Sequence, residues 1–397
     1  MPEAFIVTGL RTPIGNFRGS LAALGAAELG TLVAGELLRR SGLRGRDIDE
    51  VLLGCILQAG LGQNVARQVA LGAGVPREKT AMTVNMVCGS GLRAVSLAVQ
   101  AIRCGDAHMV LAGGTESMSN APYLLPKARS GYGMGHGTIV DSMIRDGLWD
   151  AFNDYHMGVT AENLADRYQL TRQMQDEFAE QSQQKAERAI ATGRFKEEIV
   201  PVSIPRKKGD PVVVEADEFP RPGTTAAALA RLQPAFKTDG TVTAGNASGI
   251  NDGAACVLVA SEGAVRAHGL TPMARVVSYA YTGTDPSVMG IGPVQAVRDA
   301  LSRAGWDLAS VDLIEANEAF AAQSLAVAKE LGFDMARLNV NGGAIALGHP
   351  VGASGARILV TLLHEMRRRG SRRGLATLCI GGGMGIAMCV ERVAGDP

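Results

Sequence analysis

Residues 88–93, Cys-Gly-Ser-Gly-Leu-Arg, return later in the chain as residues 352–357, Gly-Ala-Ser-Gly-Ala-Arg, 264 positions further on. A second pair of segments, Arg-Ser-Gly-Leu at 40–43 and Arg-Ala-Gly-Trp at 303–306, lies 263 positions apart. Chance similarity between glycine-rich segments is the alternative, but it would not keep a common register. Two matches in the same order and at nearly the same spacing therefore indicate a duplicated structural unit.

Each half of the chain alternates short apolar runs with amphipathic runs, which predicts an α/β fold with helices packed on a largely parallel sheet. Equivalent helices are expected at 27–40 and 294–303, and again at 90–103 and 354–368. Buried strands are expected at 4–8, 109–114, 254–260 and 378–382. Matching the Gly-Gly ends of 109–114 and 378–382 raises the offset to 268, so four extra residues are expected in the Arg-rich turn of the second copy.

Residues 119–248 have no counterpart in the other half and are richer in polar and charged residues. Within them, 160–192 is expected to form two helices, with Thr171 as a cap, and 212–215 a short strand. We expect a lid or substrate-binding subdomain here, with an oligomerisation arm as the alternative.

Composition narrows the class of protein. The 397 residues include 39 Lys+Arg and 39 Asp+Glu, and a neutral chain makes an extended nucleic-acid footprint unexpected. No apolar run approaches the ~18 residues of a membrane span. The first strand begins almost at Met1, which leaves no room for a secretory signal, so the cytoplasm is the expected compartment.

Glycine is over-represented, at 50 of 397 residues, and it clusters at 88–91, 113–114, 342–343 and 381–383. Turn chemistry alone could explain any single pair. Four clusters that flank Cys or His favour an active site, because glycine permits close approach of a ligand to the backbone.

Cys88 follows an extended segment, 81–87, and precedes the start of a helix. Orphan amides and the positive end of the helix dipole favour thiolate over thiol, which predicts a nucleophilic cysteine, although a buried structural cysteine is the common alternative. Cys379 precedes Ile-Gly-Gly-Gly-Met-Gly, whose amides could bind a developing oxyanion. The other cysteines (55, 104, 256 and 389) have apolar or helical surroundings and are expected in the core. The sequence has no C-x-x-C pair, so a zinc site is not indicated.

His349 lies between Gly348 and Pro350. The proline restricts the backbone of His349 to extended conformations, and the glycine before it permits a sharp turn. A histidine held in this way can act as a base toward a thiol or as a donor to a carbonyl oxygen. Asn317 follows an expected strand at 313–315, at the carboxyl end where open α/β sheets place ligands. No P-loop motif is present in the sequence.

These motifs together resemble the thiolase family, and within it the bacterial biosynthetic enzymes. The similarity runs from residue 4 to about 392 and includes 85–91 (NMVCGSG), 317–320 (NEAF), 341–350 (NGGAIALGHP) and 379–385 (CIGGGMG). The resemblance implies duplicated βαβαβ halves that form a layered α/β/α/β/α core. The implied units are an N-terminal half at 1–118 plus 249–270, an inserted loop subdomain at 119–248 and a C-terminal half at 271–397.

The resemblance also implies a reversible ping-pong Claisen condensation of two acetyl-CoA molecules to acetoacetyl-CoA and CoA. Cys88 would take the acetyl group, His349 would accept its proton and Cys379 would deprotonate the second acetyl-CoA. His349 and a water held by Asn317 would form one oxyanion site, and the amides of Cys88 and Gly381 the other. No metal or redox cofactor is implied, and the family is usually tetrameric, as a dimer of dimers.

Carried over by position, further residues are implied to contact coenzyme A or the acyl chain: Leu148, His156, Met157, Arg221, Phe236, Ser248, Met289 and Ala319. Met289 corresponds to the position that limits acyl length. Ala228 stands where close relatives carry a Ser near the adenine, and Val65 where Pro is usual, which we expect to need only a loop adjustment.

Two other functions stay open. A degradative thiolase for longer 3-ketoacyl-CoA, or a thiolase for branched or dicarboxylic acyl chains, would use the same chemistry, although Met289 and residues 155–158 favour short chains. A non-catalytic acyl-CoA carrier on the same fold would not need Cys88, Cys379 and His349 together.

Overall fold

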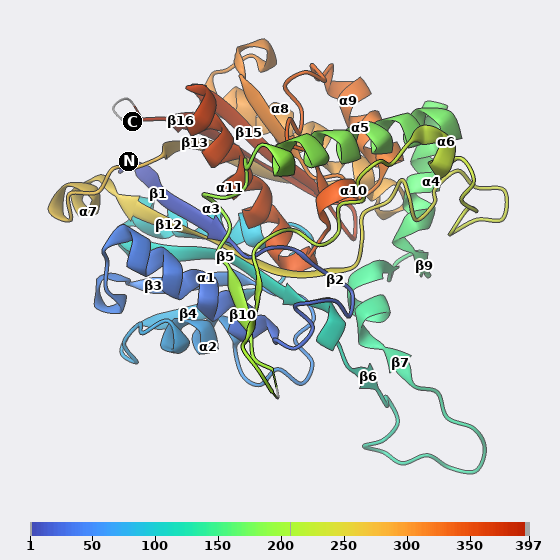
Figure 1. The fold of residues 1–397 in the computed structure, drawn as a ribbon, viewed down its shortest axis with the longest axis horizontal. Helices are drawn as coiled ribbons and strands as arrows, with labels where there is room; N and C mark the ends of the chain where they lie inside the picture. Colours follow the sequence, from blue (N-terminus) through green and yellow to red (C-terminus); the bar gives the residue numbers. More distant parts are fainter. Residues whose placement is uncertain (1, 207, 394–397) are drawn as a thin grey trace.

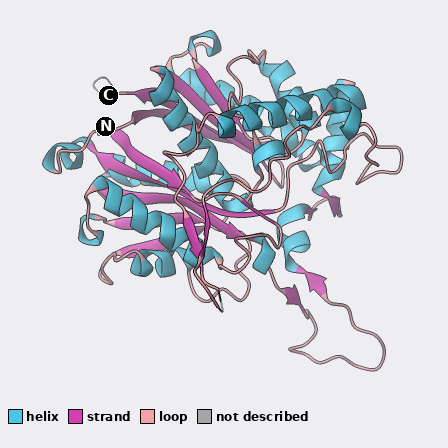
Figure 2. Cartoon of the chain, viewed as in Figure 1, coloured by secondary structure: helices cyan, strands magenta, loops and turns pink. Residues whose placement is uncertain are grey.

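The computed structural model describes residues 2–206 and 208–393; residues 394–397 of the expected C-terminal half lie outside this range. Its centre is a ten-stranded sheet with helices on both faces, and the two ends of the described chain lie on the same side of the molecule (Figures 1 and 2). Along the sheet the strand order is β14-β15-β16-β13-β1-β12-β5-β3-β4, with β2 pairing to β12. Among the described helices, none is long and apolar enough to cross a membrane.

The N-terminal half supplies one end of the sheet and the helices around it. Its strands are β1 (Ala4–Arg11), β2 (Gly15–Asn16), β3 (Glu50–Gly54), β4 (Thr80–Val84), β5 (Met109–Ser117) and β12 (Asn251–Ser261). Its α-helices are α1 (Ala26–Ser41), α2 (Val65–Gly72), α3 (Ser90–Cys104) and α7 (Glu262–Ala267). The helices expected at 27–40 and 90–103 and the strands expected at 4–8, 109–114 and 254–260 are confirmed.

The C-terminal half repeats this order. Its strands are β13 (Ala274–Gly283), β14 (Leu313–Ala316), β15 (Arg373–Ile380) and β16 (Met384–Arg392). Its helices are α8 (Gly292–Ala304), α9 (Ala321–Leu331), α10 (Ala344–Leu347) and α11 (Val351–Arg369). The expected helices 294–303 and 354–368 are confirmed, and α11 begins three residues earlier than predicted. The strand expected at 378–382 is β15, which starts earlier and ends at Ile380.

Equivalent hydrogen bonds confirm the duplication. The carboxylate of Asp49 accepts from the amides of His108 and Met109 at 2.8 and 3.0 Å. The carboxylate of Asp312 accepts from the amides of Arg372 and Arg373, both at 2.8 Å. The carboxylates lie 263 positions apart and the amides 264, so the offset stays constant through the second strand of each pair.

The expected offset of 268 and its four extra residues are therefore wrong. Sheet register aligns Gly113 of β5 with Thr377 of β15, because Leu53 pairs with Gly113 and Ala316, which lies 263 positions after Leu53, pairs with Thr377. Gly114 therefore corresponds to Leu378. The Gly-Gly pairs that the sequence comparison matched are not equivalent positions, since 381–383 form the turn after β15.

The layers follow from which faces the helices bury. Helices α3 and α11 pack against each other between the two halves of the sheet, in a core shared by strands of both halves. Helices α1 and α2 cover the outer face of the N-terminal strands, and α8 and α9 the outer face of the C-terminal strands. The result is the expected α/β/α/β/α layering.

Glycines set the distance between α3 and α11. A Cβ on Gly91 would lie 2.7 Å from the amide nitrogen of Ala356, and a Cβ on Gly355 would lie 2.5 Å from that of Leu92. The two glycines occupy equivalent positions of the repeat, so each helix supplies the gap that the other fills. Only glycine allows the helix starts to approach this closely.

The sheet is mixed, so the expectation of a largely parallel sheet is wrong. Among the named strands of the described residues, the parallel pairs are β3–β4, β3–β5 and β14–β15, and at least one helix lies between the two strands of each pair in the chain. β15 and β16 are joined by a tight turn at 381–383 and must run antiparallel. In the N-terminal half, β12 pairs antiparallel with both β5 and β1. In the C-terminal half, β16 pairs antiparallel with β13.

The segment between β5 and β12 occupies the place of that tight turn. Its strands are β6 (Tyr123–Leu124), β7 (Val140–Asp141), β8 (Trp149–Asp150), β9 (Tyr155–His156), β10 (Val202–Ile204) and β11 (Val212–Val214). Its α-helices are α4 (Met157–Tyr168), α5 (Arg172–Ala191) and α6 (Ala226–Leu229), and a π-helical turn spans Met143–Leu148. Figure 1 shows β6 and β7 at the base of a loop that projects away from the sheet. The two expected helices are α4 and α5, and the expected strand is β11, so these predictions are confirmed. The Thr171 cap is also confirmed, because its Oγ1 accepts from the Met174 amide.

Arg11, at the end of β1, ties this segment to the core. Its guanidinium contacts Glu198 Oε1 at 2.6 Å and both carboxylate oxygens of Asp217 at 2.6 and 2.9 Å. Asp217 Oδ1 also accepts from the amide of Ile14, and Glu198 Oε1 accepts from Thr361 on α11. All these charges are buried, so each depends on its partners.

Asp217→Ala is expected to lower the free energy of unfolding by about 3–5 kcal/mol, because it leaves a buried guanidinium with one carboxylate and the Ile14 amide without an acceptor. Denaturant unfolding at fixed protein concentration measures this. Glu78→Ala removes an exposed ion pair with Arg77 and is the control, with almost no shift of the midpoint. Equal shifts in the two variants would contradict the role of Asp217.

Candidate active site

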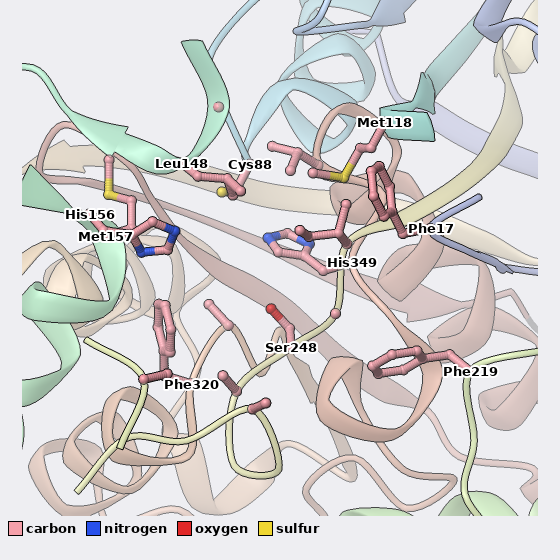
Figure 3. A pocket seen from close by; sticks show the side chains of 18 of the residues that line it. Phe17, Cys88, Met118, Leu148, His156, Met157, Phe219, Ser248, Phe320 and His349 are labelled. Carbon is pink, nitrogen blue, oxygen red and sulfur yellow. The ribbon is translucent and has the colours of Figure 1, made fainter. Parts of the chain in front are cut away.

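One pocket of about 660 Å³ opens beside the N-termini of α3 and α11, and Cys88, His349 and Gly381 lie in its wall. In Figure 3 the side chains of Cys88, His349 and Ser248 surround the same space, with His156 and Met157 on one side and Phe17 and Phe219 on the other. The pocket therefore combines residues of both halves with residues of the segment between β5 and β12.

A strained turn presents Cys88. Strand β4 ends at Val84, earlier than the extended segment that the sequence predicted, and Val87 has φ of 44°. Such a conformation is costly for a β-branched residue and persists only where its surroundings impose it. Asn85 Oδ1 accepts from the Val87 amide, while Ser90 Oγ accepts from the Met86 amide and donates to the Val87 carbonyl, both at 2.7 Å.

The surroundings of the Cys88 thiol act on its pKa in opposite directions. Burial raises the pKa of Cys88 to about 11, although hydrogen bonds from the amides of Gly381 and of Cys88 itself act to lower it. The amides act in the direction expected of a helix terminus, but desolvation of the thiol outweighs them. The thiol therefore needs a proton acceptor in order to react at neutral pH. The two amides can stabilise negative charge that develops on or near the sulfur.

His349 is held at both its backbone and its ring. Its amide donates to Asn251 Oδ1 at 2.8 Å, after a left-handed turn at Gly348 (φ 104°). On the ring, Nδ1 lies 2.6 Å from Ser354 Oγ. Burial first, and then the positive charge of Arg357, lower the pKa of His349 to about 4, so the imidazole is neutral at pH 7.

Cys379 lies beneath the pocket rather than in its wall, as far as the described residues show. It is the residue before the end of β15, fully buried in an apolar cluster with Met289, Ala319 and Phe320, which do line the pocket. Burial, and then the charge of the nearby Cys88, raise the pKa of its thiol. The two sulfurs are therefore close enough to interact electrostatically.

Asn317 is also buried behind the pocket, directly after β14. Its amide nitrogen donates to the Thr377 carbonyl of β15 at 2.9 Å. Within the described part of the chain, neither its side-chain oxygen nor its side-chain nitrogen has a hydrogen-bond partner. Buried amides are rarely left unpaired, so this side chain is suited to hold a water molecule.

The segment between β5 and β12 forms the opposite wall. The ring of His156 stacks on Phe236 with centroids 4.6 Å apart, and Phe236 meets Phe320 edge-on at 6.1 Å. The Ser248 amide donates to the Ala319 carbonyl at 2.9 Å. These contacts join the segment to the C-terminal half and make a largely apolar wall.

Most of the residues implied by sequence gather in the wall of this pocket, while Cys379 and Asn317 lie behind it. Those in the wall are Cys88, His349, Gly381, Leu148, His156, Met157, Arg221, Phe236, Ser248, Met289 and Ala319. Ala228 lies exposed on α6, and Val65 is the first residue of α2, a position that also suits Pro. The loop adjustment expected at Val65 stays a prediction.

Sequence reasoning missed several residues that shape the site. Asn251 and Phe219 carry no sequence signal, because distant segments bring them there. Ser354 could have been found, since it is the repeat equivalent of Ser90. Glu116, buried at the end of β5, accepts from the amides of Ile56, Leu57 and Gly352 and so caps the start of α11; burial raises its pKa to about 7.

No group of three or more His, Cys, Asp or Glu side chains within residues 2–206 and 208–393 is arranged to hold a metal ion.

Two family models match nearly the whole chain. The model of the thiolase N-terminal domain matches residues 4–263, and that of the thiolase C-terminal domain matches residues 270–392. The chain belongs to the thiolase family.

Relatives within the family narrow the similarity further. An acetyl-CoA acetyltransferase of Pseudomonas aeruginosa is 62% identical over 392 residues, which cover 99% of this chain and 100% of the relative. A probable acetyl-CoA acetyltransferase of Escherichia coli is 58% identical, again over 99% and 100% of the two chains. The crystal structure of the Bacillus anthracis acetyl-CoA acetyltransferase superposes with a TM-score of 0.97 at 45% identity and 99% coverage of both chains.

The pKa of Cys88 predicts how its alkylation responds to pH. Because only the thiolate reacts and its pKa is about 11, the rate with iodoacetamide is expected to rise roughly tenfold per pH unit up to at least pH 9. Peptide mass mapping of the modified Cys88 measures it. In urea-unfolded protein the same peptide should instead level off above ~8.5. A plateau below pH 8 in the folded protein would show that the thiolate forms without help.

Proposed function

We propose that this chain is an acetyl-CoA acetyltransferase, which condenses two acetyl-CoA molecules to acetoacetyl-CoA and CoA in a reversible ping-pong reaction. The observation that carries the proposal is that Cys88 receives the amide hydrogen bond of Gly381 in the same pocket as a neutral, buried His349. The names and full-length similarity of the relatives support it. The substrates are coenzyme A thioesters, and the mechanism needs no metal or redox cofactor.

In the first half-reaction, His349 accepts the proton of Cys88 as the sulfur attacks the thioester carbonyl of acetyl-CoA. The amides of Cys88 and Gly381 hydrogen-bond to the oxygen of the tetrahedral intermediate, a contribution of roughly 3 kcal/mol for each donor on mutagenesis scales. The intermediate collapses with loss of the CoA sulfur, which takes the proton back from His349. Acetyl-Cys88 remains.

In the second half-reaction, the Cys379 thiol first loses its proton to solvent water, and the thiolate then removes an α-proton from a second acetyl-CoA. His349 and a water held by Asn317 hydrogen-bond to the enolate oxygen, and the enolate carbon attacks the carbonyl of acetyl-Cys88. The new carbon–carbon bond forms as the Cys88 sulfur leaves, and that sulfur recovers the proton that Cys379 carries. The burial that raises the pKa of Cys379 makes its thiolate a stronger base.

The apolar wall supports a short acyl chain over the longer chains of a degradative thiolase. Met289 is 4% exposed and packs with Ala319 and Phe320, so little free space remains beside Cys379. In the same proposal, Leu148, His156, Met157, Arg221, Phe236 and Ser248 contact coenzyme A. A non-catalytic carrier is disfavoured because both sulfurs and the imidazole share one site.

The organisation around this activity is also proposed. The units are 1–118 with 249–270, the inserted subdomain 119–248 and the half 271–397. We further propose a cytoplasmic homotetramer, a dimer of dimers, that binds neither nucleic acid nor membrane. The loop projecting from β6 and β7, with exposed Tyr123, Leu125 and Ile139, supports contacts between subunits.

Cys379→Ser is expected to separate the half-reactions. Acetyl-CoA should still place an acetyl group on the Cys88 peptide, detected by mass analysis after quenching, while condensation falls by several orders of magnitude because a hydroxyl is a far weaker acid than a thiol. Cys88→Ala is the control and should lose both the label and turnover. An acetyl group on Cys379 in the unmodified protein would reverse the assigned roles.

Met289→Ala is expected to widen the acyl range. The ratio of kcat/KM for a ten-carbon 3-ketoacyl-CoA to that for acetoacetyl-CoA should rise roughly tenfold, within the range that one buried apolar group controls. Met174→Ala, an exposed position on α5, is the matched control and should leave the ratio unchanged. An unchanged ratio in Met289→Ala would show that other residues limit chain length.

A further inference from the structure

The hydroxyl of Ser354 is placed between two groups that can each use it. Ser354 lies in the first turn of α11 and is fully buried. Its Oγ lies 2.6 Å from His349 Nδ1 and 2.9 Å from the Pro350 carbonyl oxygen. A hydroxyl carries one proton, so it can donate to only one of the two at a time.

The two positions of that proton define two states of the imidazole. When Ser354 donates to the Pro350 carbonyl, Nδ1 must carry a proton to make its short contact, and Nε2 is bare. When Ser354 turns its proton to Nδ1, Nδ1 is bare and Nε2 carries the proton. A carboxylate in this place could only accept, and would hold the proton on Nδ1.

The proposed half-reactions need both states. Burial keeps His349 neutral before and after each proton transfer, so one nitrogen of the resting ring lacks a proton. Acyl transfer requires a bare Nε2 to take the Cys88 proton, whereas condensation requires Nε2–H to donate to the enolate oxygen. Between the half-reactions one proton moves from Nδ1 to Nε2 by exchange with solvent water, and the site gains and loses no net charge.

We propose that Ser354 is a positioning residue that keeps the His349 ring in one orientation while allowing either tautomer. This inference rests on the proposed function, because it is the two half-reactions that require the two tautomers. The hydrogen bond from the His349 amide to Asn251 fixes the backbone of His349 but leaves its ring free to rotate. The contact between Nδ1 and Ser354 Oγ restricts that rotation.

The duplicated half supports a dedicated role for this serine. Ser90 lies at the equivalent position of α3, and its hydroxyl also both accepts and donates, in the turn that holds Cys88. The two equivalent serines thus hold different groups: Ser90 bonds the backbone of the turn before α3, and Ser354 contacts the ring of His349. A serine that only packed the helix would need no such second partner.

The first test measures the two half-reactions separately in Ser354→Ala and Ser354→Thr. We expect Ser354→Ala to lose roughly 10²-fold in both acetylation of Cys88 and condensation, with thiolysis KM little changed. Ser354→Thr, which keeps the hydroxyl, should recover to within about tenfold of the unaltered protein. Ser96→Ala is the control and should leave both rates unchanged. Ser96 is a buried serine of α3 whose side chain, among the residues that the structure describes, bonds only to Arg93.

The second test reads the tautomer directly. With histidine rings labelled by ¹⁵N, the signals that vanish in His349→Asn belong to His349. We expect Nδ1–H in the free protein and a gain of Nε2–H in acetylated Cys379→Ser protein with acetyl-CoA bound. One tautomer in both states, or normal rates in Ser354→Ala, would overturn the inference. Failure of the unaltered protein to thiolyse acetoacetyl-CoA would instead overturn the proposed function.

Discussion

The close approach of α3 and α11 is the constraint on which the rest of the molecule depends. Gly91 and Gly355 leave room for each other's helix, and a side chain at either would collide with backbone. Because the two helix starts meet, the turn that carries Cys88 and the turn that carries His349 open into the same space. Each half alone would have only part of this site, so packing of the repeat and assembly of the site are the same event.

The repeat was predictable from sequence because its signal is local. The Ser-Gly of each copy begins a helix, and the spacing is carried in the chain itself. The direction of the strands was not predictable from alternation, since a hairpin at 381–383 and a helical crossover leave similar apolar runs. The Gly-Gly pairs misled the comparison because glycine serves in β5 as a strand residue and after β15 as a turn.

The site was predictable where its residues lie within a motif, as for Cys88, His349 and Gly381. It was not predictable where contact comes from distant segments, as for Asn251 at the His349 amide. Electrostatics could not be read from neighbours in the chain either. Cys88 does lie two residues before the start of α3, but the burial that opposes its ionisation comes from the assembled halves.

One copy of the duplicated hairpin is three residues long, and the other has grown into the whole segment between β5 and β12. The short copy places Gly381 in the wall of the pocket, two residues after Cys379 of β15, whereas the long one supplies a wall with His156 and Phe236. The segment between β5 and β12 can therefore change in sequence and length while the turn at 381–383 keeps its place. Changes in the long segment, natural or engineered, can therefore alter which ligand the pocket binds while Cys88, His349 and Gly381 stay where the two halves place them.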